Sequence, residues 1–271
     1  MKAVIKRKRL LYKNCLCLIL LFFPVIISAV PLTIAAIDWC PQLCPKKNKT
    51  IYINNSDKKP GFIIDIVKAV FKNSPFELEI EYYPWSRAIK LVKEGKIDVL
   101  LSPAKAEAPS LRYPKEEIGI QRMCFFTSKK SSWNYIDAHS LNKMQIGIGN
   151  DTSIEELNDY VKENPEQFQF QPYLGRYLKQ SIRKLDNKRI DTFIFTYNTT
   201  MYELTRMGVV DKYRNAGCVN TTNIYMAFTA KNDNKTINKA ITLFDKKMAE
   251  LHKKGKIKKI MGNYKLSSWR K

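Results

Sequence analysis

Hydrophobic and polar residues alternate with two different periodicities in residues 60–102. Apolar side chains recur every three or four positions over 61–71, which predicts an amphipathic helix. Apolar and acidic residues alternate over 76–81, which predicts a strand with one buried face. A second helical pattern ends near Gly95, and the short apolar run 99–101 is typical of a buried parallel strand. Helix, strand, helix and strand in this order predict an α/β lobe.

Similar patterns predict further elements along the chain. Strands are expected at 31–37, 123–127, 146–148, 192–195 and 225–229, and helices at 177–185 and 236–264, the last with a break at Gly255. Irregular segments that contain prolines separate these elements at 38–55 and 103–114. Thr152 and Ser153 each begin a capping box, with a Glu three residues later, so we expect them to open a helix.

The first 29 residues have the features of a secretory signal. Basic residues occur between positions 2 and 13, an apolar stretch covers 16–27, and Ala29 is a small residue suited to cleavage. About a dozen apolar residues fall short of the roughly 20 that span a bilayer as a helix. We therefore predict cleavage after Ala29 and export to the periplasm. The alternative is an uncleaved membrane anchor.

The chain is strongly basic, with a formal net charge of +22. Removal of the signal takes away six basic residues and no acidic ones, and leaves a charge of +16. Such a charge is typical of proteins that bind nucleic acids or anionic surfaces. Here, however, Lys outnumbers Arg by 36 to 11 and is spread along every predicted helix. We therefore expect a solvated Lys-rich surface and no nucleic-acid partner.

Four cysteines remain once the signal is removed: Cys40, Cys44, Cys124 and Cys218. An exported protein meets an oxidising compartment, where disulfides form. Four cysteines allow three connectivities, and the short separation of Cys40 and Cys44 favours a bond between these two. A zinc site is the alternative, but the sequence has no second close Cys pair, and His139 and His252 are isolated. We expect no metal and no cofactor.

Several motifs occur in a characteristic order: G-F-x-x-D-I at 61–66, Trp85 followed by G-K-I-D at 95–98, QIGIGNDTSIEEL at 145–157, NKRIDTFIF at 187–195 and LHKKGKIKKIMGNY at 251–264. Together they resemble bacterial extracellular solute-binding proteins of family 3. This resemblance implies an α/β, two-lobe type II periplasmic binding protein fold with two hinge crossings, each lobe being a sheet flanked by helices. Lobe 1 is expected to hold residues 30–120 and 224–271, and lobe 2 residues 121–223. The resemblance also places Cys124 and Cys218 near the crossing strands, which favours a second disulfide.

The resemblance implies a ligand site between the lobes, with these residues: Trp39, Trp85, Arg87, Ser102, Lys105, Thr152, Ser153 and Thr196. The two tryptophans match positions where the family stacks a ring on its ligand, although a core role is the alternative. Ser102 and Lys105 follow a predicted strand, where the family presents hydrogen-bond donors. The pair at 152–153 is expected at a helix start, which attracts a carboxylate. For Arg87, the alternative to ligand binding is an exposed position at the start of a helix.

Two positions depart from the family pattern. Members that bind ordinary amino acids hold the ligand carboxylate with an Arg after the lobe 1 strand, and here the nearest one, Arg112, is displaced by two residues. The family holds the ligand ammonium with an Asp at the position where this chain has Thr196. A neutral hydroxyl does not pair with an ammonium as a carboxylate does. The usual α-amino-acid clamp is therefore incomplete, and the class of ligand stays open.

The resemblance favours a monomeric, non-catalytic receptor that captures a small polar solute, amino-acid-like or related, and delivers it to the permease of an ABC-type membrane transporter. A lyase or dehydratase on the same fold is one alternative, and it would need a general acid or base such as Asp38 or Glu107. A sensory binding module is the other alternative. Because the chain ends at Lys271 without a signalling domain, we expect such a module to dock onto a separate partner.

Overall fold

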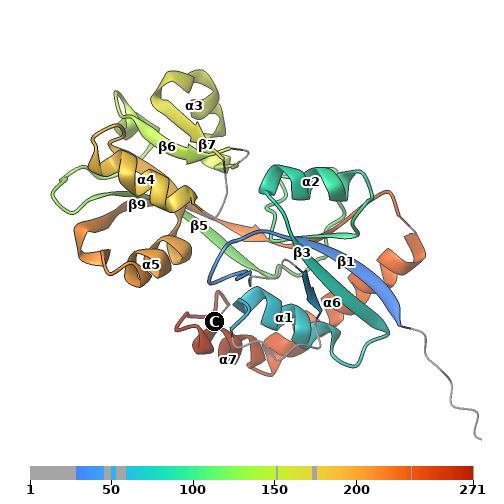
Figure 1. Ribbon diagram of the computed structural model, residues 1–271. Coiled ribbons are helices and arrows are strands. Elements are labelled where there is room, and N and C mark those ends of the chain that lie inside the picture. Colours follow the sequence, from blue (N-terminus) through green and yellow to red (C-terminus); the bar gives the residue numbers. More distant parts are fainter. Residues whose placement is uncertain are drawn as a thin grey trace, which may run out of the picture.

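The structure is a computed structural model, and it describes residues 29–45, 50–52, 59–150, 152–172, 176–232 and 234–270. The predicted signal peptide lies outside the described residues, apart from Ala29. Two five-stranded sheets, each flanked by helices, form two lobes (Figure 1). We call the sheet of order β10-β4-β1-β3-β2 with its helices lobe 1, and the sheet of order β7-β6-β8-β5-β9 with its helices lobe 2. The predicted α/β two-lobe architecture is confirmed.

Lobe 1 is built around two parallel strand pairs. Its strands are β1 (Val30–Ala36), β2 (Thr50–Tyr52), β3 (Phe76–Tyr82), β4 (Val99–Leu101) and β10 (Met226–Phe228). Its helices are α1 (Phe62–Phe71), α2 (Trp85–Lys93), α6 (Asn234–Lys253) and α7 (Lys256–Asn263). Strand β1 pairs in parallel with β3 and β4, whereas β2 and β10 join the edges antiparallel. Helix α2 lies on one face of this sheet, and α1, α6 and α7 lie on the other (Figure 1).

Lobe 2 also contains two parallel strand pairs, and β5 and β9 are the longest of the described strands. Its strands are β5 (Gly119–Ser128), β6 (Ile146–Gly149), β7 (Phe168–Gln171), β8 (Thr192–Thr196) and β9 (Tyr213–Ile224). Its helices are α3 (Asn158–Glu163), α4 (Tyr177–Asp186) and α5 (Tyr197–Arg206), with 3-10 turns at Ala138–Leu141, Glu155–Leu157, Pro165–Gln167 and Val210–Lys212. Helices α4 and α5 pack on β5 and β8.

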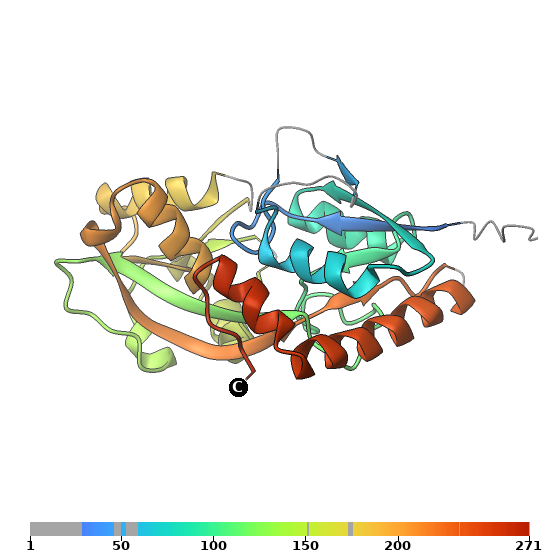
Figure 2. The ribbon, with the colours of Figure 1, turned by 90° about the horizontal axis from the view of Figure 1, so that it is seen from below.

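The antiparallel pair β5 and β9 connects the two lobes (Figure 2). Gly119 and Ile224 pair at the lobe 1 end of these strands, and Ser128 and Tyr213 pair at the far end. A disulfide between Cys124 and Cys218 joins the two strands where these residues are direct cross-strand partners. The expected placement of this second disulfide on the crossing strands is therefore found, and the pair is not available as zinc ligands.

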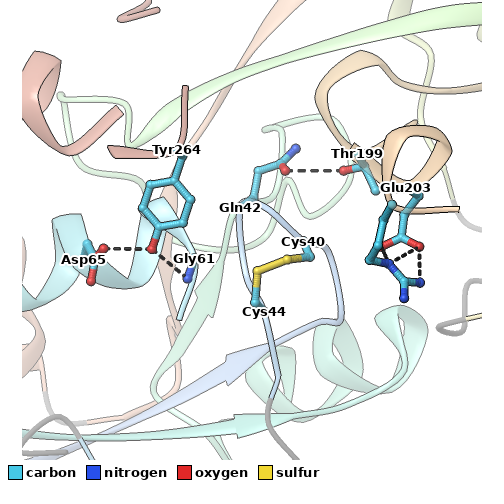
Figure 3. Close-up of a disulfide and its surroundings, with 9 residues drawn as sticks. Cys40, Gln42, Cys44, Gly61, Asp65, Thr199, Glu203 and Tyr264 are labelled. Atoms are coloured by element: carbon cyan, nitrogen blue, oxygen red, sulfur yellow. Dashed lines mark hydrogen bonds and ion pairs between the residues drawn. A yellow bond between two sulfur atoms is a disulfide. The ribbon is translucent and has the colours of Figure 1, made fainter. Parts of the chain in front are cut away.

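Hydrogen bonds between distant motif residues hold lobe 1 together. The Tyr264 hydroxyl donates to the Asp65 carboxylate at 2.8 Å and accepts from the Gly61 backbone N–H at 3.1 Å (Figure 3). The Asp98 carboxylate accepts from the backbone N–H of Thr33 at 3.0 Å and from its hydroxyl at 2.8 Å. These contacts give the G-F-x-x-D, G-K-I-D and G-N-Y motifs a structural role in lobe 1.

Most predicted elements agree with the structure, and the differences have local causes. The hydrophobic patterns of residues 60–102 correctly predicted helices α1 and α2 and strands β3 and β4. Strand β4 is fully buried and parallel to β1, as expected. The segment expected to be an irregular loop at 38–55 contains the short edge strand β2. Strands β7 and β9 and helix α5 were not predicted. Of the described residues, no helix is long and apolar enough to cross a membrane.

The prediction that Thr152 and Ser153 cap a helix is wrong. The 3-10 turn that follows begins after Ile154, and no described side chain caps it. Instead, the side chain of Asn158 folds back, accepting from the Ile154 backbone N–H at 2.8 Å and donating to the Ser153 hydroxyl at 2.9 Å. The Asn158 side chain therefore holds the residues just before the turn, and the Ser153 hydroxyl bonds to this amide rather than to a backbone N–H of the turn.

Candidate functional site

A tight loop follows β1 and carries the first site tryptophan. The backbones of Trp39 and Leu43 exchange two hydrogen bonds of 2.9 Å, which closes the turn. A disulfide between Cys40 and Cys44 ties the same turn covalently (Figure 3). This connectivity is the one favoured by the short sequence separation, and it leaves the indole of Trp39 on a fixed backbone.

The N-terminus of α1 holds this loop against lobe 1. The backbone N–H groups of Phe62 and Ile63, which have no partners within the helix, donate to the carbonyls of Pro41 and Gln42 at 3.1 Å. Gly61 has a φ of +113°, and a Cβ at this position would lie 2.3 Å from the Gln42 carbonyl oxygen. The close approach therefore requires glycine here, which explains the first residue of the G-F-x-x-D motif in physical terms.

The same loop reaches across to lobe 2. The Trp39 indole Nε1 donates to the Thr196 hydroxyl oxygen at 2.9 Å. The Thr199 hydroxyl donates to the Gln42 side-chain carbonyl at 3.3 Å (Figure 3). Thr196 is the last residue of β8 and Thr199 lies in the first turn of α5. The lobes are therefore in direct polar contact beside the hinge.

A cavity lies between the lobes at this contact, and we call it the central cavity. Its lining residues are Ile37, Trp39, Trp85, Ser102, Glu107, Gln121, Met123, Thr152, Phe195 and Thr196. Its volume is about 30 Å³, which is room for one or two water molecules. The predicted residues that it brings together are Trp39, Trp85, Ser102, Thr152 and Thr196.

Ser102 is the most unusual residue of the central cavity. It is 3% exposed, and its hydroxyl has no hydrogen-bond partner among the described residues. Its φ of +72° lies in the left-handed region, which a serine rarely adopts. A hydrogen bond of 2.7 Å from its backbone N–H to the Tyr225 carbonyl helps to hold it there. A buried hydroxyl without a partner costs free energy, so this group is suited to a ligand.

A larger cavity adjoins the central one, and we call it the side cavity. Gln121 and Met123 belong to the walls of both cavities. The remaining walls of the side cavity are Ala104, Ser153, Ile154, Glu156, Val219, Asn220, Thr221 and Thr222, and its volume is about 330 Å³. Small-molecule sites usually enclose about 300–1,000 Å³. The side cavity reaches this range and contains the predicted residue Ser153.

Two other predicted residues lie elsewhere. The Arg87 guanidinium lies over the ring of Tyr83 at 5.6 Å on the exposed side of α2. The Lys105 ammonium lies over the ring of Tyr225 at 4.9 Å. Neither side chain lines the central cavity or the side cavity. Their assignment as ligand-binding residues stays a prediction that these cavities do not support.

The two departures from the family pattern have clear structural counterparts. The Arg112 guanidinium donates to the side-chain carbonyl of Asn238 on α6, and its backbone pairs with Phe228, so it contacts lobe 1 rather than the central cavity. The Thr196 hydroxyl oxygen accepts the indole N–H of Trp39, so it contacts the other lobe directly. At this position the family binds its ligand with a carboxylate, whereas this chain uses a hydroxyl in the contact between the lobes.

A third cavity, of about 360 Å³, lies on the disulfide side of the loop and contains both cysteines of the Cys40–Cys44 bond. Asp38 lines it together with Glu203 and Arg206, which form an ion pair with an N···O distance of 2.5 Å. Loss of surrounding water and the charge of Glu203 raise the pKa of Asp38, while Arg206 opposes the shift. Asp38 therefore lies outside the central cavity, which contains Glu107 instead.

Some cavity residues escaped sequence reasoning. Ile37 and Phe195 were not selected, although they lie at the ends of predicted strands, where parallel strands of α/β sheets present ligand-binding residues; this rule would have found them. Gln121 and Met123 lie on the crossing strand β5, and their neighbouring residues gave no signal that the strand enters the site. Among the described residues, no group of three or more His, Cys, Asp or Glu side chains is placed to hold a metal ion.

Comparison with known proteins connects this geometry to a family. The model of the family of bacterial extracellular solute-binding proteins, family 3, matches residues 44–109. This segment contains α1, α2, β4 and most of the lobe 1 side of the central cavity. No curated protein matches the chain by sequence.

Solved structures share the whole fold at low sequence identity. A histidine kinase sensor domain with similarity to periplasmic binding proteins has a TM-score of 0.69 at 14% identity, and the match covers 89% of this chain and 99% of that chain. The arginine-, lysine-, histidine-binding protein ArtJ from Geobacillus stearothermophilus has a TM-score of 0.67 at 14% identity, with 89% and 97% covered. A substrate-binding protein of a Streptococcus pneumoniae ABC uptake transporter, with bound histidine, has a TM-score of 0.66 at 17% identity, with 89% and 95% covered. The type II periplasmic binding fold is confirmed.

Proposed function

We propose that this chain, which has the type II periplasmic binding fold and resembles the family-3 solute-binding proteins, binds a small polar solute between its two lobes. The observation that carries the proposal is the Ser102 hydroxyl, which is buried and has no partner among the described residues, in a cavity that both lobes line. Residues from the two lobes meet there at the hinge, where closure of the lobes buries a ligand.

Binding requires movement of the lobes. The central cavity holds about 30 Å³, so a solute gains entry only when the contact between Trp39 and Thr196 opens or shifts. The crossing strands β5 and β9 connect the lobes and supply the hinge. The central and side cavities then form one site, because they share walls.

The cellular role that we propose is delivery of the solute to an ABC-type transporter. Support comes from the match to an extracellular solute-binding family and from the amino-acid-binding proteins of ABC transporters among the structural neighbours. We further propose that the protein reaches the periplasm by a signal cleaved after Ala29 and acts there as a monomer, with lobe limits at 30–120, 121–223 and 224–271. The matched family and the neighbours are binding or sensor proteins rather than enzymes.

A panel of small solutes tests the binding function. Amino acids, amines, sugars and organic acids are each added to the purified protein, and the melting temperature is recorded. A solute at 100 times its dissociation constant should stabilise the folded protein by about 2.7 kcal/mol. Ser102→Ala should weaken the binding of the same solute, whereas Thr205→Ala, on the exposed side of α5, should not. A folded protein that responds to no solute would contradict the proposal.

A sensory role is the second candidate, favoured by the sensor domain among the structural neighbours. Both roles begin with solute binding, so binding alone does not separate them. Cells that lack the gene should lose uptake of the bound solute if the protein serves a transporter. Normal uptake, with a lost transcriptional response to the solute, would favour the sensor.

A further inference from the structure

The charges around the cavities between the lobes differ in sign from those of the whole chain. The sequence has 47 Lys and Arg residues and 25 Asp and Glu residues. Among the described residues that line the central and side cavities, the charged ones are two carboxylates, Glu107 and Glu156. Charged walls of one sign raise the local concentration of ions of the opposite sign. The site therefore favours a cation and disfavours an anion.

The basic side chains nearest in sequence to the site are engaged elsewhere. Arg122, between the wall residues Gln121 and Met123, has its guanidinium over the ring of Tyr197 at 4.2 Å. Arg112 contacts α6, Arg87 lies over an aromatic ring of lobe 1, and Lys105 lies over the ring of Tyr225. None of the four lines the central or the side cavity. A ligand carboxylate would therefore be buried without a charged partner, which is costly.

The loop that carries Glu107 holds its carboxylate in a defined position. The Ala104 backbone N–H donates to Glu107 Oε2 at 2.8 Å, and the Glu107 backbone N–H donates to the Ala104 carbonyl at 3.1 Å. The charge acts on its surroundings, because burial first and then Glu107 raise the pKa of Tyr113. The carboxylate is thus a preorganised acceptor at the wall of the central cavity.

Ser102 provides a second acceptor in the same wall. Its hydroxyl is buried and without a partner among the described residues. Ammonium and guanidinium groups carry several N–H donors, so one group of this kind has donors for both the Glu107 carboxylate and the Ser102 hydroxyl. Hydrogen bonds between a charged donor and a carboxylate are about twice as strong as neutral ones.

Building on the function proposed above, we propose that the solute is an organic cation, an amine or a guanidine, whose charged group binds Glu107 and Ser102. Its recognition requires no carboxylate. The rest of the solute occupies the side cavity beside Glu156. The carboxylate of Glu156 is fixed there by the Tyr135 hydroxyl at 2.9 Å and by the Asn220 backbone N–H at 3.1 Å.

Calorimetric titration with matched probes tests this inference. Agmatine and putrescine carry cationic groups without a carboxylate, arginine carries both, glutamate has a net negative charge and glucose is neutral. We expect agmatine or putrescine to bind at least as tightly as arginine, and glutamate and glucose to bind more weakly. Glu107→Gln keeps an oxygen that accepts the Ala104 N–H, so the loop should persist while affinity for the cationic probe falls about tenfold or more.

A control variant and three contrary outcomes complete the test of cation binding. Glu94→Gln removes an exposed carboxylate that pairs with Lys96 on lobe 1, and it should leave affinity unchanged. Binding of glutamate or glucose but of no cationic probe would overturn this inference and leave solute binding in place. Unchanged affinity of Glu107→Gln for a cationic probe would also overturn it. A folded protein that binds none of the five probes would count against the inference, whereas the wider solute panel decides on the proposed function itself.

Discussion

The indole Nε1 of Trp39 donates a hydrogen bond of 2.9 Å to the hydroxyl oxygen of Thr196. Trp39 follows β1 in lobe 1, and Thr196 ends β8 in lobe 2, so this bond joins the two lobes. The two residues are 3% and 4% exposed, and both line the central cavity. The same contact therefore fixes the ring at the candidate site and holds the lobes together.

Thr196→Val should weaken the contact between the lobes, because valine keeps the shape of the side chain and removes the acceptor. A buried indole N–H without a partner costs about 1–3 kcal/mol, so the free energy of unfolding should fall by that amount. Urea denaturation measures this loss, and small-angle X-ray scattering should show a larger radius of gyration. Thr205→Val is the matched control, since its hydroxyl bonds within α5 on an exposed face. An equal loss in both variants would argue against a role for the bond between the lobes.

The order of elements in lobe 1 was predictable because its hydrophobic patterns are regular. Helix α1 buries one face at helical spacing, and β3 buries Leu78 and Ile80 in alternation, so local sequence is enough to find them. Strand β9 escaped because Arg, Asn and Thr make up half of its 12 residues and its register with β5 shifts twice, which disrupts the alternation. Edge strand β2 escaped because it has three residues between polar segments.

The site was predictable only in part, since its central contacts join residues that are far apart in the sequence. Resemblance was enough to select Trp39, Trp85, Ser102, Thr152 and Thr196 as candidate residues, and these meet at one cavity. The bond between Trp39 and Thr196 joins residues 157 positions apart, and no local pattern reveals it. The orientation of Arg112 toward α6 likewise depends on packing within lobe 1.

The two disulfides should contribute differently to stability because they close loops of different length. Removal of the Cys40–Cys44 bond by a double Cys→Ser change should cost about 2 kcal/mol, and removal of the Cys124–Cys218 bond about 4–5 kcal/mol, since the sequence separations are 4 and 94. The first change should also weaken solute binding, because it loosens the loop that carries Trp39. Urea denaturation and calorimetry of both double variants measure these effects, and the reverse order of stability losses would contradict the expectation.

The stability of the C-terminal segment should depend on pH through Glu117. This carboxylate is 8% exposed and accepts from the Trp269 indole at 2.8 Å and from Arg270 Nε at 2.6 Å. Burial raises the pKa of Glu117, but the hydrogen bonds from Arg270 and Trp269 outweigh it and lower the pKa below its usual value. A lowered carboxyl pKa means that the folded protein binds fewer protons than the unfolded chain, so the stabilisation is present above about pH 4 and is lost as the pH falls through the folded pKa.

Glu117→Gln should therefore lower the free energy of unfolding at pH 7 by about 1–3 kcal/mol and make little difference in strong acid. Urea denaturation at several pH values measures the difference from the unchanged protein. Glu94→Gln, at an exposed position, should show almost no effect at pH 7. A Glu117→Gln loss of equal size at every pH would mean that packing, rather than charge, determines the effect.

Trp85 should contribute both to stability and to binding, because it is 6% exposed, packs in the lobe 1 core and lines the central cavity. Trp85→Ala should reduce the free energy of unfolding by about 3–5 kcal/mol and weaken solute affinity by about tenfold or more, the second from the loss of ring contact. Trp85→Phe keeps a ring and should lose less stability and less affinity.

Trp133→Ala provides the control, because Trp133 packs edge-on against Phe125 in lobe 2 at 5.7 Å and lines neither the central nor the side cavity. Both alanine variants should melt at lower temperature, but only Trp85→Ala should lose affinity when binding is measured well below the melting point. Unchanged affinity of Trp85→Ala under these conditions would make Trp85 a core residue alone and would remove the aromatic wall from the proposed site.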